Sequence, residues 1–349
     1  MMRTYALFAI LWFIFSNLCF SYPRGIPELD KLIEKAPIIC VVIGGQMQSK
    51  MSKIAIDDTI SRHGMECVTE AEVINVFRGN LQKGDKIFIR GLAAPNTPLE
   101  YLEEGEMAIV FLQHKEANNY EFVLREYSKV AIPCLNKDYR PNGQSLRKEI
   151  NSYIISLLYQ SKDEKILFEV YNLITRLNII VNADMLNNKE MQGSPEIKAI
   201  LLALSVKSGD QKAIVQTGEY LISSHKELTP EAIGVLGVIS NKAYSRYVPL
   251  ETANQLASSD NPFVREIGIT ILRDIGNQDS IPVIINSLKI QSEDKMLRLV
   301  DKRIHLQAVW ALYRITGIKM HKGSDTQIVE QVPQLRNQWL KWWEERGNK

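Results

Sequence analysis

Residues 260–288, DNPFVREIGITILRDIGNQDSIPVIINSL, carry the clearest structural signal in the chain. The Asn-Pro pair at 261–262 is typical of a helix start, because asparagine caps the first turn and proline fits its first position. Apolar residues then recur at helical spacing on one core face: Val264, Ile267, Gly268, Ile271, Leu272 and Ile275. Asp279 is predicted to cap a second short helix, whose face is Ile281, Ile284, Ile285 and Leu288. The stretch therefore predicts two amphipathic helices joined by a tight turn.

Helical periodicity of this kind continues on both sides, from residue 146 almost to the C-terminus. It predicts about five helix pairs at a spacing of roughly 30–50 residues, the range in which helical solenoids occur. Helices this short bury only one stripe each, so neighbouring pairs must stack to shield their apolar faces. We therefore expect residues 144–349 to form an α–α superhelical repeat stack that a tryptophan-rich helix closes at its C-terminal end.

The segment 258–317 resembles HEAT repeats, most closely the short form found in the phycobilisome-lyase-like group. The matching residues are Asn261-Pro262 with the Val-Arg-Glu run at 264–266, Asp-Ile-Gly at 274–276, and SIPVI at 280–284. Residues 305–317, HLQAVWALYRITG, repeat the first-helix pattern. The resemblance implies a stack that presents a long surface to a protein partner. The lyase activity of that group needs a pigment site, which we cannot identify in this sequence.

Before residue 141 the chain is dominated by short β-type runs. A helix is expected at 27–35, and strands at 38–44, 68–77, 86–90, 106–112, 120–125 and 128–132. Residues 46–64 are predicted to form a long polar loop between the first two strands. About six short strands separated by polar turns are typical of a small antiparallel barrel or sandwich, and their spacing fits a five-stranded Greek-key barrel. The sequence thus predicts a multidomain α+β protein, with a barrel domain at 22–140 before the helical stack.

The order of these β motifs is similar to the OB-type barrel of netrin-like and metalloproteinase-inhibitor-like domains. The matching pieces are residues 41–44 (VVIG), 72–79 (EVINVFRG), 84–90 (GDKIFIR) and 105–112 (GEMAIVFL). The inhibitor members act through a cysteine at the mature N-terminus, which chelates the zinc of the protease. Here the expected mature N-terminus is Tyr22-Pro23, and the next cysteine is Cys40. An OB-like barrel is therefore expected without that inhibitory mechanism.

Residues 1–21 have the pattern of a secretory signal peptide. Arg3 supplies a positive charge, residues 6–15 (ALFAILWFIF) form an apolar core of about ten residues, and Cys19 and Ser21 are the small residues before the cleavage site. The apolar run is shorter than the roughly 20 residues that a membrane-spanning helix needs. We expect a secreted or periplasmic protein with no stable membrane insertion after cleavage. An uncleaved N-terminal anchor is the alternative.

Three cysteines follow residue 21: Cys40, Cys67 and Cys134. An oxidising compartment permits one disulfide among them. Cys40 and Cys67 lie near the starts of two successive strands, which an antiparallel hairpin places at opposite ends. The pair Cys67 and Cys134 is the candidate disulfide. Pairing of Cys134 with Cys40, or three unpaired buried thiols, stays open. The absence of C-x-x-C argues against a thiol-redox or structural zinc site.

Composition and motifs exclude several classes of function. The chain has 42 Lys and Arg against 40 Asp and Glu, a formal net charge of +2, so it lacks the basic excess of a nucleic-acid-binding protein. No nucleophile, metal-ligand or phosphate-loop motif occurs, so no catalytic residue, cofactor or metal is predicted. We expect a non-enzymatic protein-binding or scaffold protein of the cell envelope. A ligand-binding protein or enzyme with a site between the two domains is one alternative, and a protease-inhibitor-like barrel is another.

The candidate residues for contact with a protein partner are few. Asp57 and Asp58 lie in the polar loop 46–64, and long loops are often either functional or simply flexible surface. Arg265 belongs to the best-formed repeat. Trp339 and Trp342, with Trp343, fall at i, i+3 and i+4 of the last helix. This spacing is typical of an aromatic binding platform or of a cap that closes the end of the stack.

Overall fold

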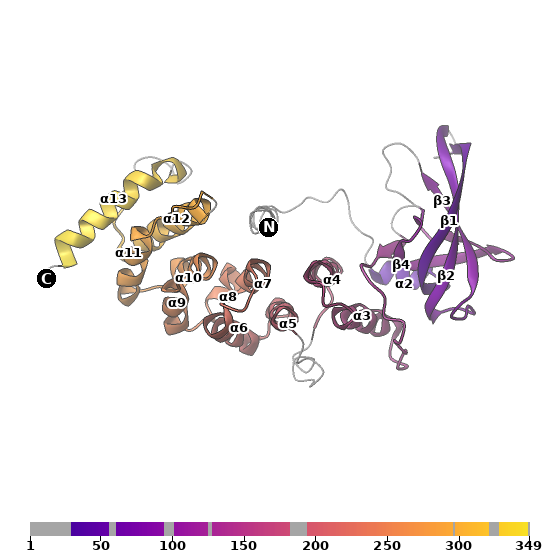
Figure 1. Cartoon of the computed structure of the whole chain (residues 1–349), viewed down its shortest axis with the longest axis horizontal. Helices are drawn as coiled ribbons and strands as arrows, with labels where there is room; N and C mark the ends of the chain where they lie inside the picture. Colours follow the sequence, from indigo (N-terminus) through magenta and orange to yellow (C-terminus); the bar gives the residue numbers. More distant parts are fainter. Residues whose placement is uncertain are drawn as a thin grey trace. The chain divides into compact units, whose positions relative to one another are not determined.

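The computed structural model describes residues 29–55, 61–93, 101–124, 128–181, 194–295, 297–320 and 328–347 (Figure 1). The chain divides into two compact units, Ser21–Ile179 and Ile180–Lys349. The described residues of the first are called the barrel unit, and those of the second the helical unit. Residues 1–21, and with them the predicted signal peptide, lie outside the described residues.

The barrel unit contains a closed β-barrel, as the sequence predicts. Its elements begin with α2 (Leu29–Lys35) and continue with β1 (Ile38–Ala55), β2 (Ser61–Arg78), β3 (Lys86–Ala93), β4 (Met107–Glu116), β5 (Asn119–Phe122) and β6 (Lys129–Ala131). The strand order is β1-β2-β3-β5-β4-β6, and an additional pairing of β1 with β4 closes the first five strands on themselves. One pair, β3 with β5, is parallel, so the expectation of a wholly antiparallel barrel is wrong at this point.

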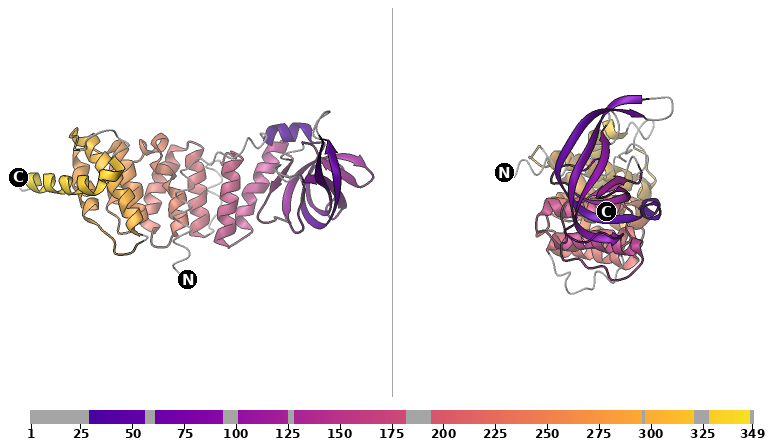
Figure 2. Two further views of the ribbon diagram at one scale, coloured as in Figure 1. Left: turned by 90° about the horizontal axis from the view of Figure 1, so that it is seen from above. Right: turned by 90° about the vertical axis from the view of Figure 1, so that its right-hand side faces the viewer.

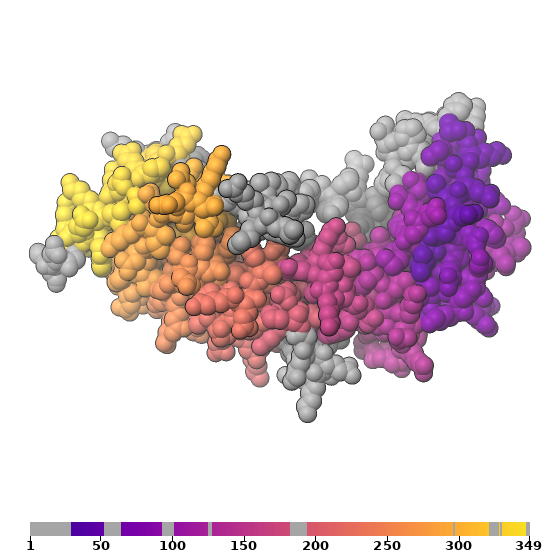
Figure 3. Space-filling model, in the orientation of Figure 1, coloured from indigo at the N-terminus to yellow at the C-terminus, as the bar shows by residue number. Residues whose placement is uncertain are grey.

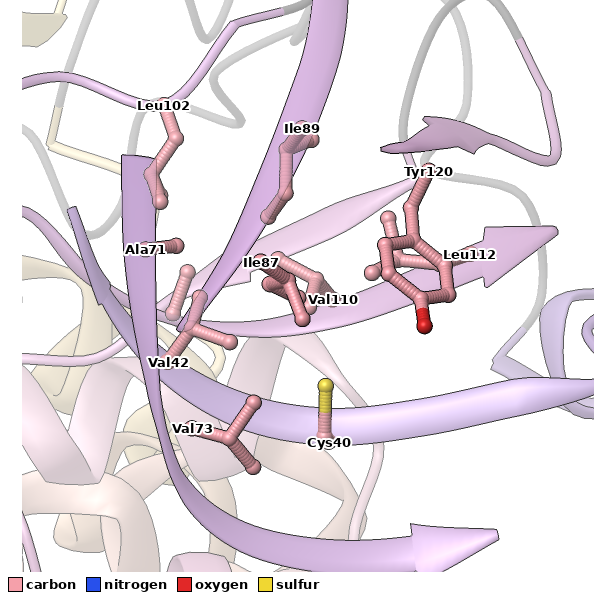
Figure 4. Close-up of a cluster of buried hydrophobic side chains, with 11 residues drawn as sticks. Cys40, Val42, Ala71, Val73, Ile87, Ile89, Leu102, Val110, Leu112 and Tyr120 are labelled. Atoms are coloured by element: carbon pink, nitrogen blue, oxygen red, sulfur yellow. The ribbon is translucent and has the colours of Figure 1, made fainter. Parts of the chain in front are cut away.

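The barrel interior is filled by alternate side chains of its strands. Figure 4 shows residues of β1, β2, β3 and β4 pointing toward one another, among them Cys40, Val42, Val73, Ile87 and Val110. In β4 the run from Ala108 to Leu112 is buried at every position, which confirms that this continuous apolar stretch forms a strand covered on both faces.

The first hairpin differs from the sequence-based expectation. Strands β1 and β2 are each 18 residues long, and most residues predicted as loop, 47–55 and 61–64, are paired strand. The long hairpin is visible at the top of Figure 1. Residues 46–51 are exposed and mostly polar, so the apolar alternation that marks a half-buried strand is weak there. Asp57 and Asp58 fall in the link between the two strands, outside the described residues.

Cys40, Cys67 and Cys134 are free thiols in the structure. Cys40 faces Val76 and Cys67 faces Ser49 in the β1–β2 register, so the hairpin keeps these two cysteines apart. The candidate disulfide between Cys67 and Cys134 is not formed. The thiol of Cys134 instead lies 3.7 Å from the carbonyl oxygen of Leu157.

Two helices, α3 (Leu146–Ser156) and α4 (Glu164–Arg176), belong to the same compact unit as the barrel. A polar and aromatic cluster joins α3 to the segment before it. The buried carboxylate of Glu149 accepts hydrogen bonds from the hydroxyl of Tyr139 (2.8 Å) and from the backbone N–H groups of Asn142 (2.8 Å) and Gln144 (2.9 Å). Tyr153 packs edge-on against Tyr139 and against Phe77 of β2.

Replacing Glu149 by glutamine is expected to destabilise the barrel unit by about 2 kcal/mol at pH 7, because hydrogen bonds to a buried charged group are lost. Burial opposes the charged form, but the hydrogen bonds from Tyr139, Gln144 and Asn142 outweigh it and lower the pKa of Glu149 below 4.5. A lowered pKa stabilises the fold above the unfolded-state value, and this contribution disappears as pH falls through the folded-state value. Denaturant unfolding at several pH values measures the difference between wild type and variant.

The matched control is Glu169→Gln on α4, whose exposed carboxylate lies 4.0 Å from the ammonium of Lys165. This substitution should cost little at any pH. A difference between wild type and the Glu149 variant that persists unchanged below pH 4 would contradict the role of the charge.

The helical unit is built from short helices with polar caps. They are α5 (Pro195–Lys207), α6 (Gln211–Ser224), α7 (Pro230–Leu236), α8 (Lys242–Ser245), α9 (Leu250–Ala257), α10 (Pro262–Ile275), α11 (Ile281–Lys289), α12 (Leu297–Thr316) and α13 (Ile328–Gly347). Ser194, Thr229 and Asn261 cap α5, α7 and α10, each followed by a proline in the first turn, as the sequence predicts. Asp279 does not cap α11. It lies in a 3-10 turn that Asn277 caps, which corrects that expectation.

These helices pack in two layers. Helices α5, α7, α8, α10 and α12 form the first layer, in which α7 and α8 both touch α10 and α10 touches α12. Helices α6, α9, α11 and α13 form the second layer, in which each helix touches the next. Contacts between the layers join neighbours along the chain, such as α5 with α6, α9 with α10, and α12 with α13. Figure 2 shows these helices side by side.

Two glycines let helices of the unit approach closely. A β-carbon on Gly268 of α10 would lie 2.1 Å from the backbone nitrogen of Ala257 in α9. A β-carbon on Gly218 of α6 would lie 2.6 Å from the γ-methyl of Thr252 in α9. The packing of α9 against α10 of the first layer and against α6 of its own layer therefore depends on the missing side chains at these two sites. None of the described helices has the length and apolar character needed to cross a membrane.

Candidate functional site

Two of the residues predicted to contact a partner are buried. Arg265 of α10 is 5% exposed, and its Nη1 donates to the carbonyl oxygen of Ser259 (2.8 Å). Burial lowers the pKa of Arg265, and Asp301 and Asp260 partly offset this effect. Trp339 of α13 is 1% exposed. Both side chains therefore belong to the interior of the helical unit and do not lie on its surface.

Trp342 lies at the edge of that interior. Its ring packs edge-on against Trp339, with centroids 5.2 Å apart, and the guanidinium of Arg346 lies 4.8 Å from its centroid. Trp342 and Trp343 are half-buried, and the C-terminal half of α13 extends beyond the other helices of its unit in Figure 2. This arrangement favours the cap interpretation for Trp339 and leaves Trp342 partly accessible.

Charged residues that the sequence did not single out hold α10, α11 and α12 together. The carboxylate of Glu266 in α10 accepts two hydrogen bonds from Arg303 of α12, at 2.6 and 2.8 Å. Asp301 accepts from the backbone N–H of Ser292 (2.7 Å), and His305 Nε2 lies 3.0 Å from the carbonyl oxygen of Ile290. Burial lowers the pKa of His305, so its ring is neutral near pH 7 and donates to that carbonyl. These contacts satisfy backbone groups at the end of α11 and are structural.

The surface of the helical unit is hollowed between α9 and the turn before α11. This acceptor-lined hollow is open, has a volume of about 490 Å³, and is lined by Leu250, Glu251, Asn254, Gln255, Ser258 and Asp279. Its α9 residues fall at i, i+1, i+4, i+5 and i+8, so one helix face supplies all of them. The close contacts of Gly268 and Gly218 with α9 fix that face in place.

Two acidic side chains are among the residues that line the hollow. The carboxylates of Glu251 and Asp279 form no ion pair with the described residues; Asp279 is reached only by the side-chain amide of Asn277, at 3.4 Å. The Oδ1 atom of Asn254 is buried and has no hydrogen-bond partner among the described residues. The hydroxyl of Ser258 is already donated to the carbonyl oxygen of Asn254 (2.9 Å). The two carboxylates without an ion-pair partner among the described residues suit a ligand that brings hydrogen-bond donors or positive charge.

Catalytic chemistry has no comparable arrangement in the described part of the chain. Burial raises the pKa of Cys40 to about 12 and raises those of Cys67 and Cys134, which disfavours the reactive thiolate. Within the described ranges, no group of three or more His, Cys, Asp or Glu side chains is placed to hold a metal ion.

The sequence contains one pattern that could have indicated the hollow, although stronger patterns nearby drew attention away from it. Glu251, Asn254, Gln255 and Ser258 form a polar stripe at helical spacing on α9, but the apolar face of α10 was the stronger pattern. Asp279 lies beside this stripe because of the way α9 packs against the helix pair that follows. No local motif specifies that packing.

The fold and its surface define a protein with a closed β-barrel followed by a two-layer array of short helices that carries an acceptor-lined hollow. In comparisons with known proteins, no family model matches the chain, and no curated protein matches its sequence.

Proposed function

We propose that this chain is an exported, non-enzymatic interaction protein that binds a protein partner through its helical unit. In this proposal the barrel is of the OB type and the helices are HEAT-like repeats. The closure of five strands through β1 and β4 supports the first assignment, because the OB fold is a five-stranded Greek-key barrel. The two-layer packing of neighbouring helices supports the second, because repeat arrays are built from contacts between adjacent units.

The observation that carries the proposal is the acceptor-lined hollow. Its two carboxylates, of Glu251 and Asp279, lie on an open surface without a cationic partner among the described residues. A Lys or Arg side chain, or the backbone N–H groups of a bound segment, would supply what is missing. Charge-assisted hydrogen bonds of this kind are roughly twice as strong as neutral ones, and they fix the orientation of a bound group.

The test uses the purified protein immobilised and exposed to the exported fraction of its source cells. The variant carries Glu251→Gln and Asp279→Asn, which remove both charges and preserve the shape of the hollow. A partner that binds the wild type is expected to bind this variant at least about tenfold more weakly, because hydrogen bonds to charged groups contribute about 1.5–3 kcal/mol each.

The matched control carries Glu219→Gln and Glu344→Gln, which remove two charges from α6 and α13 of the same layer. It should bind as the wild type does. Equal binding by all three proteins would show that the partner does not bind at the hollow. The absence of any specifically retained protein would contradict the proposed function.

A further inference from the structure

One edge of the barrel sheet is open. Strand β1 pairs with β2 from Ile39 to Ala55, with an irregularity between Gly44 and Met47, and every residue from Met47 to Ala55 has a β2 partner. On its other side β1 pairs with β4 only from Ile38 to Ile43, and backbone hydrogen bonds from the 105–106 turn reach no further than Gly44. Beyond Gly44, no described strand pairs with this side of β1. Among the described residues, the backbone groups of 47–55 that face away from β2 therefore have no strand partner. Unpaired groups at a sheet edge can bind a further strand.

The side chains along this edge are also exposed. Every residue from Gln46 to Met51 is exposed, and the indigo residues of β1 lie at the surface in Figure 3. Met51 is 65% exposed, and Met47 and Met65 are each 39% exposed. Met51 lies directly opposite Met65 in the register, so these two share a face of the sheet, and Met47 shares it by alternation. An apolar strip thus runs beside an unpaired edge.

The sequence of the edge is symmetric in its chemistry about Ser49. In Met47-Gln48-Ser49-Lys50-Met51, an antiparallel copy centred on Ser49 places Met47 opposite Met51, and Gln48 opposite Lys50. No like charges face each other in this register, and each methionine meets a methionine on the same face. A two-fold axis requires this kind of self-complementarity, because the same patch serves both partners.

We propose that the protein forms a two-fold dimer in which β1 of one copy pairs antiparallel with β1 of a second copy, centred on Ser49. The two sheets then become continuous across the axis. On one face Met65 and Met51 of one copy adjoin Met47 of the other. On the opposite face Glu66 and Lys50 of one copy adjoin Gln48 of the other, because Glu66 is the β2 partner of Lys50.

A second copy fits this edge better than an unrelated strand for a reason specific to the sequence. Exposed edges are commonly blocked by charge, proline or an inward-pointing lysine. Here the central five residues contain a single charge, Lys50, and the two-fold register places it opposite a neutral glutamine. The edge thus lacks the charge barrier that would keep two copies apart.

The experiment uses two opposite substitutions at one exposed position, Gln48. Gln48→Lys places a new ammonium group opposite Lys50 of the second copy, twice in each dimer. Gln48→Glu places a carboxylate opposite Lys50 instead. Sedimentation velocity of the purified full chain over a dilution series measures the dimer dissociation constant. Relative to wild type, we expect a roughly two- to thirty-fold weaker dimer for Gln48→Lys and a tighter one for Gln48→Glu, from the measured range of cross-strand charge pairs.

Charge interactions within one chain predict the opposite order for the two Gln48 variants. On β2 the diagonal neighbours of Gln48 are Glu66 and Glu70, on either side of its direct partner Val68. Within a monomer, lysine at position 48 is therefore favoured and glutamate is disfavoured, which is opposite to the order expected for the dimer. Thermal unfolding of both variants at low concentration checks that each remains folded.

A spin label at Ser49→Cys gives a second readout, in a chain that also carries Cys134→Ser and Cys67→Ala, because Cys67 lies directly opposite position 49 in the β1–β2 register. Paired strands lie about 4.8 Å apart, so labels at the two-fold position should broaden each other's spectra, and dilution with unlabelled protein should remove the broadening. If the protein stays monomeric up to its solubility limit, the proposal is wrong, and a strand of another protein becomes the expected occupant of the edge. A dimer with the same dissociation constant for both Gln48 variants would also overturn it.

Discussion

Replacing Gly268 by alanine is expected to destabilise the helical unit by about 3 kcal/mol, near the upper end of the usual range for overpacked cores. The new methyl group would lie 2.1 Å from the backbone nitrogen of Ala257 and 2.5 Å from the carbonyl carbon of Leu256. No side-chain rotation can relieve a clash with backbone, so α9 and α10 must separate. Alanine is about 1 kcal/mol better than glycine inside a helix, which offsets only part of this cost. Thermal unfolding should show a transition lower by roughly 6–12 °C.

Gly218 provides the matched comparison for that experiment. An alanine there meets only the side chain of Thr252, whose γ-methyl would lie 2.6 Å away. Gly218→Ala should therefore cost less than Gly268→Ala, and adding Thr252→Ser, which removes that methyl, should restore most of the loss. Gly268→Ala has no such rescue within reach of one side chain. If Gly268→Ala unfolds at the wild-type temperature, the close approach of α9 and α10 is wrong.

The sequence predicted the elements whose signals are local. Asn261 and Pro262 specify a helix start wherever that helix lies, and the structure has α10 beginning there. The apolar run of β4 likewise specifies a buried strand without reference to its partners. Some predictions that depended on contacts between residues distant in the sequence were wrong. Asp279 follows a helix end and precedes another helix, but the cap is supplied two residues earlier, by Asn277.

The prediction of a loop at the outer half of the first hairpin was wrong for a related reason. Residues 46–55 are polar and contain no long apolar alternation, so their composition favours a loop. They form strand because they pair with β2 from Met47 to Ala55. That pairing is a tertiary property and overrides weak local propensity. The same holds for the acceptor-lined hollow, which combines one face of α9 with Asp279, a residue from the turn before α11.

Arg265 shows how a correct motif can suggest a wrong role. A charged residue in the first turn of a helix is usually solvated, and as part of the best repeat it was a reasonable candidate for partner contact. In the structure the two-layer packing covers it, and its guanidinium donates to the carbonyl oxygen of Ser259. Burial of a long charged side chain follows from the arrangement of neighbouring helices, which helical periodicity along one segment does not specify.

Replacing Trp339 by alanine is expected to destabilise the helical unit by about 3–5 kcal/mol, the usual cost of removing a large aromatic side chain from a core. Trp339 is among the largest fully buried side chains of the described residues, and it continues the buried face of Ile328, Val332 and Leu335 on α13. Its loss opens a cavity and removes the edge-on contact with Trp342. Chemical denaturation followed by circular dichroism measures the loss directly.

Trp343→Ala on the same helix is the control, because that ring is half-buried and its nearest described aromatic neighbour is Trp342, with centroids 6.4 Å apart. It removes the same number of atoms from a neighbouring turn of α13 but should cost only about 1–2 kcal/mol, since part of that ring is already exposed in the folded protein. The contrast between the two variants separates the two interpretations of the tryptophan-rich helix. A cap requires Trp339 for stability, whereas a binding platform would leave stability nearly unchanged in both variants. Equal and small losses would therefore contradict the cap.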